Sequence, residues 1–172
     1  MPRDFTRKNI RLPLENYRGK GSYFVTLCFH RRRRLGTNPR IARWLIKELR
    51  EHASACRFLI HAYCIMPDHI HFLAEGVTAE SDLTQFVIRF KQGTAFQFTG
   101  GTTSPLWQFK YYDHILRRAE GAEKVAWYIW MNPVRKRLCV MPQDFPFSGS
   151  FTEQGMRLLK SQPKLEWIPP WK

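Results

Sequence analysis

Two histidines that stand two residues apart, His69 and His71, are the first candidates for chemistry in this sequence. They begin the segment 69–75, whose mixture of apolar and aromatic residues is typical of a strand. Because successive side chains of a strand point to opposite faces, both imidazoles are predicted on one face, with Ile70 and Phe72 on the other. Two such nitrogens can converge on one divalent cation and leave positions open for water or a phosphate oxygen. Two hydrogen-bonded histidines on a sheet would show the same spacing, so the pair alone does not decide between these interpretations.

A second candidate pair, Tyr128 and Asn132, lies four residues apart in a segment with helical periodicity. Residues four apart share a helix face, a phenol can act as a nucleophile, and an amide oxygen can be a metal ligand. The structural alternative is a core aromatic residue, followed by an asparagine that ends the helix before Pro133. Tyr111 and Tyr112 are alternative nucleophiles, but their extended segment has no ligand-like residue four positions away.

The charge balance restricts the class of partner. The 172 residues include 28 Lys and Arg against 14 Asp and Glu, a formal net charge of +14. Such an excess favours polyanions, with nucleic acid first and an anionic membrane surface second. The run Arg31 to Arg34 either contacts phosphates or forms a solvated loop. No apolar stretch approaches the ~20 residues that span a bilayer, and residues 1–4 lack a signal region, so we expect a cytoplasmic, nucleoid-associated protein without a membrane partner.

The elements that must position these residues alternate along the chain. Strands are expected over 22–29, 57–66 and 69–75, and a short strand or extended segment over 106–116. Helices are expected over 39–55, 81–98 and 120–137. The first six elements follow the order βαββαβ, so the fold class is α+β: a ferredoxin-like antiparallel sheet with an additional C-terminal helix that bears Tyr128. Asn132-Pro133 is expected to interrupt that helix. Residues 1–21 are interpreted as a basic N-terminal arm, 22–150 as one domain, and 151–172 as an irregular Pro-rich tail.

Four motifs in a fixed order resemble those of one family. They are Met66-Pro67-Asp68-His69-Ile70-His71-Phe72, Trp107-Gln108-Phe109-Lys110-Tyr111-Tyr112-Asp113-His114-Ile115-Leu116-Arg117, Tyr128-Ile129-Trp130-Met131-Asn132-Pro133-Val134-Arg135, and Asp144-Phe145-Pro146-Phe147-Ser148. This set resembles the REP-associated tyrosine transposases, a branch of the HUH single-tyrosine transposases, over about residues 21–150. Asp68 stands where many relatives have Asn. Arg135-Lys136-Arg137-Leu138 stands where many have a small residue or Gly after the nucleophile motif.

The resemblance implies a catalytic domain in which Tyr128 attacks a DNA phosphate to form a 5′-phosphotyrosine. It implies that His69, His71 and Asn132 hold Mg²⁺ or Mn²⁺, and that the substrate is single-stranded DNA with hairpins formed by palindromic repeats. We expect the candidate DNA contacts to be the basic and imidazole side chains Arg31, Arg32, Arg33, Arg34, His114, Arg117, Arg135 and Lys136. For His114, however, the favoured interpretation is a hydrogen-bonded structural histidine. Relatives include monomers and homodimers, and the alternative function is a non-catalytic protein that binds hairpin DNA or RNA.

Overall fold

A five-stranded antiparallel sheet forms the centre of the computed structural model, which describes residues 12–100 and 105–161. The strands, in the spatial order β4-β1-β3-β2-β5, are β1 (Ser22–Cys28), β2 (Phe58–Ile65), β3 (His69–Gly76), β4 (Tyr112–Ile115) and β5 (Ser148–Gly149). The α-helices are α1 (Pro39–Ala55), α2 (Leu83–Thr99), α3 (Ala122–Arg135) and α4 (Glu153–Leu159). Short 3₁₀ turns lie at Leu14–Tyr17, His30–Arg32, Leu35–Thr37, Arg118–Glu120 and Pro142–Asp144. The predicted α+β class and βαββαβ order are confirmed, and β5 extends the sheet beyond β2.

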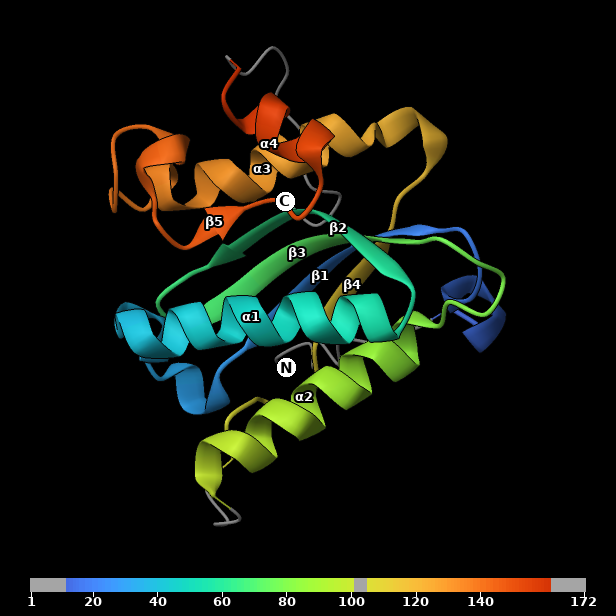
Figure 1. Cartoon of the computed structure of the whole chain (residues 1–172), viewed down its shortest axis with the longest axis horizontal. Helices are drawn as coiled ribbons and strands as arrows, with labels where there is room; N and C mark the ends of the chain where they lie inside the picture. The colour runs from blue at the N-terminus through green and yellow to red at the C-terminus, as the bar shows by residue number, and fades with distance from the viewer. Residues whose placement is uncertain (1–11, 101–104, 162–172) are drawn as a thin grey trace, which may run out of the picture.

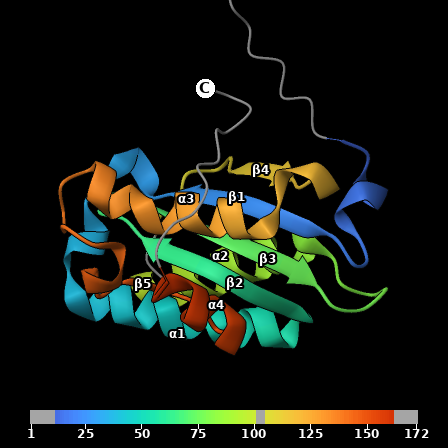
Figure 2. The same ribbon diagram turned by 90° about the horizontal axis from the view of Figure 1, so that it is seen from above.

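The helices cover both faces of the sheet. Helices α1 and α2 lie on one face, and α3 and α4 lie on the other (Figures 1 and 2). The alternation of β3 divides its apolar residues between the two layers, because Ile70 and Phe72 pack toward α1 and α2, whereas Leu73 packs toward α3. On β1, Val25 likewise faces α1 and α2 while Phe24 faces α3. The two histidines of β3 therefore belong to the α3 side of the sheet.

Both helices of the first layer begin at side-chain caps. Asn38 accepts a hydrogen bond from the backbone N–H of Arg40 at 2.9 Å, and Pro39 occupies the first turn, where a missing N–H costs nothing. Asp82 accepts from the backbone N–H of Gln85 at 3.0 Å at the start of α2. These caps explain why α1 begins where the sequence predicts it.

The expected interruption at Asn132-Pro133 is wrong, since α3 continues through Pro133 to Arg135. Proline removes the N–H that would bond the carbonyl of Ile129. The side-chain amide of Asn132 supplies a replacement, with Nδ2 donating to the Ile129 carbonyl at 3.3 Å and to the Tyr128 carbonyl at 3.0 Å. The asparagine thus compensates for the proline that follows it.

The structure differs from three other expectations. The irregular tail expected over 151–172 is wrong for Glu153–Leu159, which form α4 behind the Thr152 cap, and residues 162–172 lie outside the described part. The strand expected over 106–116 is shorter, because only Tyr112–Ile115 pair with β1 along their length. Residues 1–11 of the expected N-terminal arm lie outside the described part. Within the rest of the arm, Tyr17 is buried in the core and its ring stacks on that of Tyr23. No helix in residues 12–100 and 105–161 is long and apolar enough to cross a bilayer.

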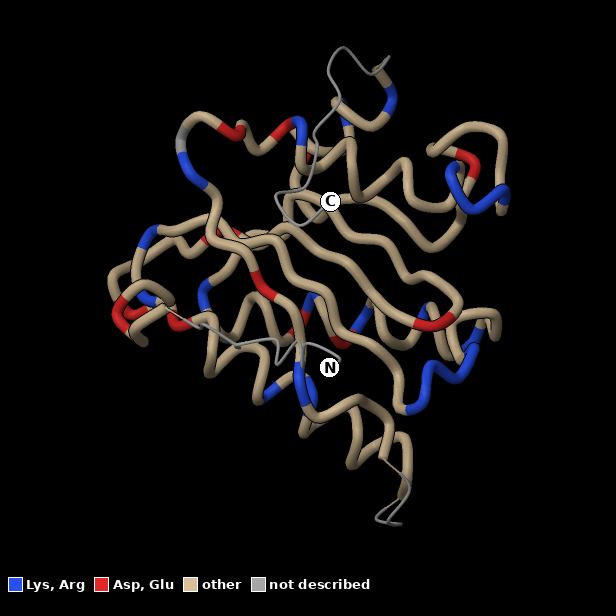
Figure 3. Tube along the Cα trace, turned by 180° about the vertical axis from the view of Figure 1, so that it is seen from behind, with Lys and Arg blue, Asp and Glu red and all other residues tan. Residues whose placement is uncertain are grey.

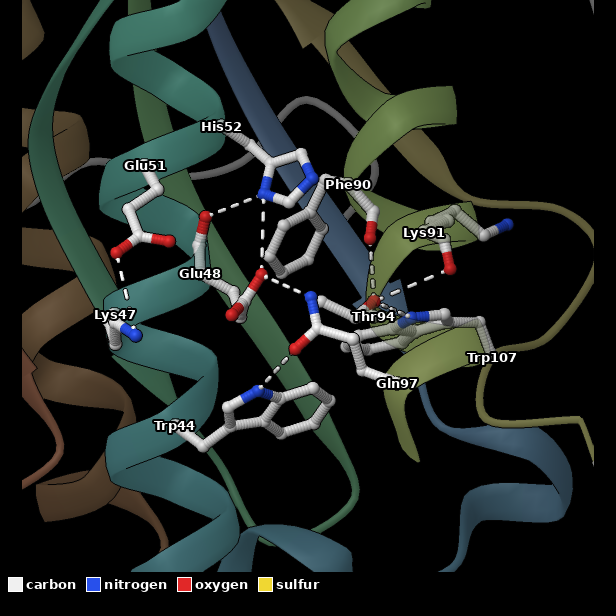
Figure 4. Close-up of polar contacts among 10 residues, drawn as sticks. All are labelled: Trp44, Lys47, Glu48, Glu51, His52, Phe90, Lys91, Thr94, Gln97 and Trp107. Carbon is white, nitrogen blue, oxygen red and sulfur yellow. Dashed lines mark hydrogen bonds and ion pairs between the residues drawn. The ribbon is translucent and has the colours of Figure 1, made fainter. Parts of the chain in front are cut away.

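The contact between α1 and α2 contains a buried carboxylate (Figure 4). Glu48 is 4% exposed, and its Oε2 accepts from Nε2 of Gln97 at 3.0 Å and lies 3.7 Å from Nδ1 of His52. Gln97 in turn accepts from the indole N–H of Trp44 at 3.2 Å. Gly93 allows the close approach of the helices, since a Cβ there would lie 2.9 Å from Nε2 of His52.

We expect Glu48→Ala to lower the free energy of unfolding by about 2 kcal/mol, because the partners of the lost carboxylate stay partly buried without their acceptor. Glu51 on the same helix is the matched control, since its ion pair with Lys47 is exposed and Glu51→Ala should cost less than about 0.5 kcal/mol. Urea denaturation followed by circular dichroism measures both variants. Equal midpoints would contradict a stabilising role for the buried network.

Candidate active site

The two histidines of β3 converge on one point of the sheet face that α3 covers. Nε2 of His69 lies 2.9 Å from Nε2 of His71, while Ile70 and Phe72 face the opposite layer. Two nitrogens bound to one cation at ~2.1 Å and at a right angle would stand roughly 3 Å apart. The separation of the imidazoles therefore fits two adjacent ligand positions of a single divalent ion.

Each imidazole is oriented through its other nitrogen. Nδ1 of His69 lies 2.6 Å from Oδ1 of Asp68, and Asp68 also accepts from Arg32 at 3.3 Å. Nδ1 of His71 lies 2.8 Å from Oγ1 of Thr26, which is its direct partner in the pairing of β1 with β3. A metal-binding histidine commonly uses its second ring nitrogen in this way, which fixes the tautomer and leaves the Nε2 lone pair for the ion.

Burial keeps both imidazoles neutral. Burial lowers the pKa of His69, although the Asp68 carboxylate opposes it. Burial lowers the pKa of His71 well below its usual value, and the guanidinium charges of Arg135 and Arg32 add to this effect, as would any charge on His69. Burial of Asp68 would raise its pKa, but the hydrogen bond from His69 and the charge of Arg32 lower it overall. Neutral imidazoles beside an ionised carboxylate are the protonation states that cation binding requires.

Phe24 of β1 holds the candidate nucleophile next to the histidines. Its fully buried ring stacks on His71 with centroids 5.3 Å apart and meets the Tyr128 ring edge-on at 5.9 Å. The Tyr128 and His71 rings are 6.5 Å apart. The structure thus brings together, on one face, residues that lie 57 positions apart in the sequence.

Asn132 lies one helical turn after Tyr128 on α3. Its amide nitrogen is engaged by the helix carbonyls described above, so its amide oxygen is the atom that could reach a cation. In the described residues no cluster of three or more His, Cys, Asp or Glu side chains could hold a metal.

Arg135 is oriented toward the candidate nucleophile. Its guanidinium carbon lies 4.5 Å from the centre of the Tyr128 ring, and its Nη2 donates to the Tyr128 carbonyl at 2.6 Å. Burial raises the pKa of Tyr128, and the charge of Arg135 acts in the opposite direction. The guanidinium would stabilise the phenolate oxygen or a nearby phosphate.

Basic residues surround the histidine pair from two distant segments. The Arg31–Arg34 run and the basic residues 135–137 at the end of α3 lie at the same end of the molecule (Figure 3). The charges of Arg32 and Lys136 both lower the pKa of His69. Arg31 and Arg34 are exposed, whereas Arg33 donates to the carbonyl of Pro105 at 2.5 Å. The run is therefore partly an anchored turn and partly a free cationic surface.

The remaining predicted contacts lie near β4. Nε2 of His114 lies 2.7 Å from Oε1 of Glu120, an arrangement that agrees with the structural interpretation of this histidine. Arg117 is exposed, and its backbone N–H donates to Glu120 at 2.7 Å.

Sequence reasoning missed two neighbours of the site, Thr26 and Phe24, and considered a third, Tyr112, only as an alternative nucleophile. Tyr112 packs edge-on against Phe24 at 6.2 Å, and its pKa is raised to about 12 by burial and by the charges of Asp113, Glu120 and Tyr128. Tyr112 and Thr26 face each other in the pairing of β4 with β1. Only the register of these strands identifies such neighbours, because no local motif marks them.

The chain matches a known protein family and several of its members. The family described as "Transposase IS200 like" matches residues 19–131, a range that contains His69, His71 and Tyr128 and ends one residue before Asn132. The chain is 25% identical to the REP-associated tyrosine transposase of Escherichia coli (strain K12), over 74% of this chain and 75% of that protein. It is 24% identical to an uncharacterized protein of Haemophilus influenzae, over 74% of this chain and 88% of the relative.

A solved structure shares the fold. It shows a REP-associated tyrosine transposase bound to a REP hairpin, with a TM-score of 0.64 and 24% identity over 77% of this chain and 78% of that one. The family match covers more than half of the chain and includes all of β3 and the part of α3 that carries Tyr128. The chain therefore belongs to the IS200-like transposase family, and REP-associated tyrosine transposases are among its relatives.

Proposed function

We propose that this protein cuts and rejoins single-stranded DNA beside a hairpin, with Tyr128 as the nucleophile and a divalent metal ion at His69 and His71. The observation that carries the proposal is the convergence of the two Nε2 atoms, 2.9 Å apart, on the sheet face where the Tyr128 ring lies 6.5 Å from that of His71. A protein that only binds DNA needs neither the paired nitrogens nor the adjacent phenol.

His69, His71 and the amide oxygen of Asn132 would hold Mg²⁺ or Mn²⁺. The bound ion would offset the negative charge that develops on the phosphate during attack. The protein's own contribution is orientation, since Asp68 and Thr26 fix the two imidazoles and the helix carbonyls fix the Asn132 amide. Nitrogen and neutral oxygen ligands leave the ion its positive charge for the substrate.

The chemistry is an exchange of one phosphate ester for another. The phenolic oxygen of Tyr128 forms a bond to phosphorus, the bond from phosphorus to the 3′ oxygen breaks, and that oxygen takes a proton while the phenol loses one. The products are a 5′-phosphotyrosine and a free 3′-OH, and attack by a 3′-OH reverses the step without an external energy source. Because burial raises the pKa of Tyr128, the nearby Arg135 guanidinium contributes by stabilising the phenolate.

The proposed substrate is single-stranded DNA that carries a hairpin. The solved transposase with a similar fold is bound to a REP hairpin. The net charge of +14, together with the basic residues of the Arg31–Arg34 run and of the end of α3, fits a polyanionic substrate. We propose that the protein works in the cytoplasm at the nucleoid, as a monomer or homodimer. A non-catalytic hairpin-binding protein is the alternative, and it would form no covalent adduct.

Replacing the nucleophile should separate cutting from binding. We expect Tyr128→Phe to abolish the covalent adduct with a labelled hairpin oligonucleotide and to leave hairpin affinity within about twofold, because the variant removes one hydroxyl group. Denaturing gels and mass spectrometry of the adduct measure the outcome. Tyr112→Phe is the matched control, and an adduct located on Tyr112 or retained in Tyr128→Phe would contradict the assignment.

Removing a metal ligand should have a different signature. We expect His71→Ala to reduce adduct formation at least ~100-fold and to abolish Mn²⁺ binding measured by electron paramagnetic resonance, because one of two imidazole ligands is lost. His61 on β2, which pairs with Glu75 at 2.5 Å, is the matched control. Thermal unfolding verifies that both variants fold, and unchanged Mn²⁺ binding in folded His71→Ala would exclude this metal site.

The exposed arginines should set the salt dependence of binding. We expect the double change Arg31→Ala and Arg34→Ala to reduce the magnitude of the slope of log affinity against log salt by about 1 to 2. With fewer phosphate contacts, binding releases fewer counterions from the DNA. Arg89→Ala with Arg157→Ala, on α2 and α4, is the charge-matched control. Fluorescence anisotropy at several salt concentrations measures the slopes. Equal slopes for the double variant and the wild-type protein would show that Arg31 and Arg34 lie in a solvated turn and do not contact phosphates.

A further inference from the structure

The Arg31–Arg34 run is fastened to the turn that leads into β3. On the N-terminal side of the run, the backbone N–H of Phe29 donates to the Asp68 carbonyl at 3.1 Å. On its C-terminal side, the backbone N–H of Gly36 donates to the Pro67 carbonyl at 2.9 Å. The two turns hold one another in place, so a charge on the run has a fixed position relative to the candidate metal ligands of β3.

Two successive arginines of the run have left-handed backbone conformations. Arg31 has a φ of 52° and Arg32 a φ of 55°, a region that residues with a Cβ rarely adopt. The backbone N–H of Arg32 donates to the Phe29 carbonyl at 2.9 Å, and Nη2 of Arg33 donates to the Pro105 carbonyl at 2.5 Å. Such conformations persist where surrounding contacts enforce them, and they are concentrated at functional sites. The contacts of the turn thus fix the direction of the Arg32 side chain.

One carboxylate joins Arg32 to the candidate metal site. Nη1 of Arg32 lies 3.3 Å from Oδ2 of Asp68, and Oδ1 of Asp68 lies 2.6 Å from Nδ1 of His69. The Arg32 side chain is 55% exposed, and a guanidinium has several N–H donors arranged as a fork. A phosphate can therefore bind the same guanidinium from the solvent side.

The charge of Arg32 opposes a cation at the histidine pair. It lowers the pKa of His69 and acts in the same direction on the pKa of His71. A charge that disfavours a proton on an imidazole also disfavours a metal ion there, and the repulsion is larger for a divalent ion. The Asp68 carboxylate offsets only part of this repulsion, because it is shared between the imidazole and the guanidinium.

We infer that Arg32 couples DNA binding to metal binding. In the free protein its charge weakens cation binding at the histidine pair. A DNA phosphate that engages the guanidinium neutralises this charge and leaves the Asp68 carboxylate to His69, so the metal affinity rises when DNA is bound. By thermodynamic linkage, the metal raises the DNA affinity by the same factor. The inference rests on the proposed function, since it requires a metal at the histidines and a phosphate at the run.

The test measures Mn²⁺ binding by electron paramagnetic resonance in a Tyr128→Phe parent, in which no covalent adduct forms. We expect Arg32→Gln to tighten Mn²⁺ binding to the free protein by roughly threefold, because one nearby positive charge is removed. With saturating hairpin DNA, both proteins should bind Mn²⁺ alike, so the gain in Mn²⁺ affinity that DNA produces falls by the same factor. Direct contact between the metal and the DNA contributes equally to both proteins.

Arg31→Gln is the matched control, because Arg31 has the same charge and backbone conformation, whereas the ion pair with Asp68 belongs to Arg32. This variant should weaken hairpin binding but leave the Mn²⁺ affinity of the free protein unchanged. Arg32→Lys keeps the charge and should behave like the parent. In about 1 M salt the effect of Arg32→Gln on the free protein should largely disappear, because the charges are then screened.

Three outcomes would overturn the coupling. Weaker Mn²⁺ binding in Arg32→Gln would show that Arg32 only holds Asp68 in place. An unchanged gain on adding DNA, or an equal effect of Arg31→Gln, would show that Arg32 does not link the two ligands. These results leave the proposed function intact, whereas a parent protein that binds no Mn²⁺ with or without DNA would refute the metal site itself. Fluorescence anisotropy of the hairpin with and without Mn²⁺ checks the reciprocal factor independently.

Discussion

The antiparallel pairing of β1 with β3 is the constraint on which the rest of the site depends. Its register sets Thr26 opposite His71 and Cys28 opposite His69, and the alternation of β3 turns both imidazoles toward α3. A shift by one residue would exchange these imidazoles with Ile70 and Phe72. Because those apolar residues are fully buried against α1 and α2, the core itself enforces the orientation of the histidines.

Helix α3 brings the second half of the site to this face, and its position is also set by buried contacts. The Trp130 indole N–H donates to the Gly149 carbonyl at 2.9 Å and so ties α3 to β5. Along the helix, the Asn132 amide compensates for Pro133, which keeps Tyr128, Asn132 and Arg135 on one continuous helix. The continuity of α3 therefore depends on the same side chain that is proposed as the neutral oxygen ligand.

The electrostatics of the site separate two tasks. The imidazoles are buried and stay neutral, as cation binding requires, while exposed arginines and lysines lie around them. The Asp68 carboxylate connects the two, since it contacts His69 on one side and Arg32 on the other. Under the proposed function, the surrounding basic side chains would attract phosphate and the neutral imidazoles would bind the cation, without one neutralising the other.

The sequence by itself determined the order of elements, the α+β class and the residues that belong together, because period-two and helical patterns are local and the four motifs are contiguous. It determined that His69 and His71 share a face, since a strand allows no other arrangement at that spacing. It misjudged Pro133, because a hydrogen bond from a neighbouring side chain overrode the usual effect of proline. It also missed α4 and β5, which are short and depend on packing against β2 and α3. Only the tertiary structure decided that Phe24, Thr26 and Tyr112 surround the site, because strand register and packing are long-range properties that no local pattern encodes.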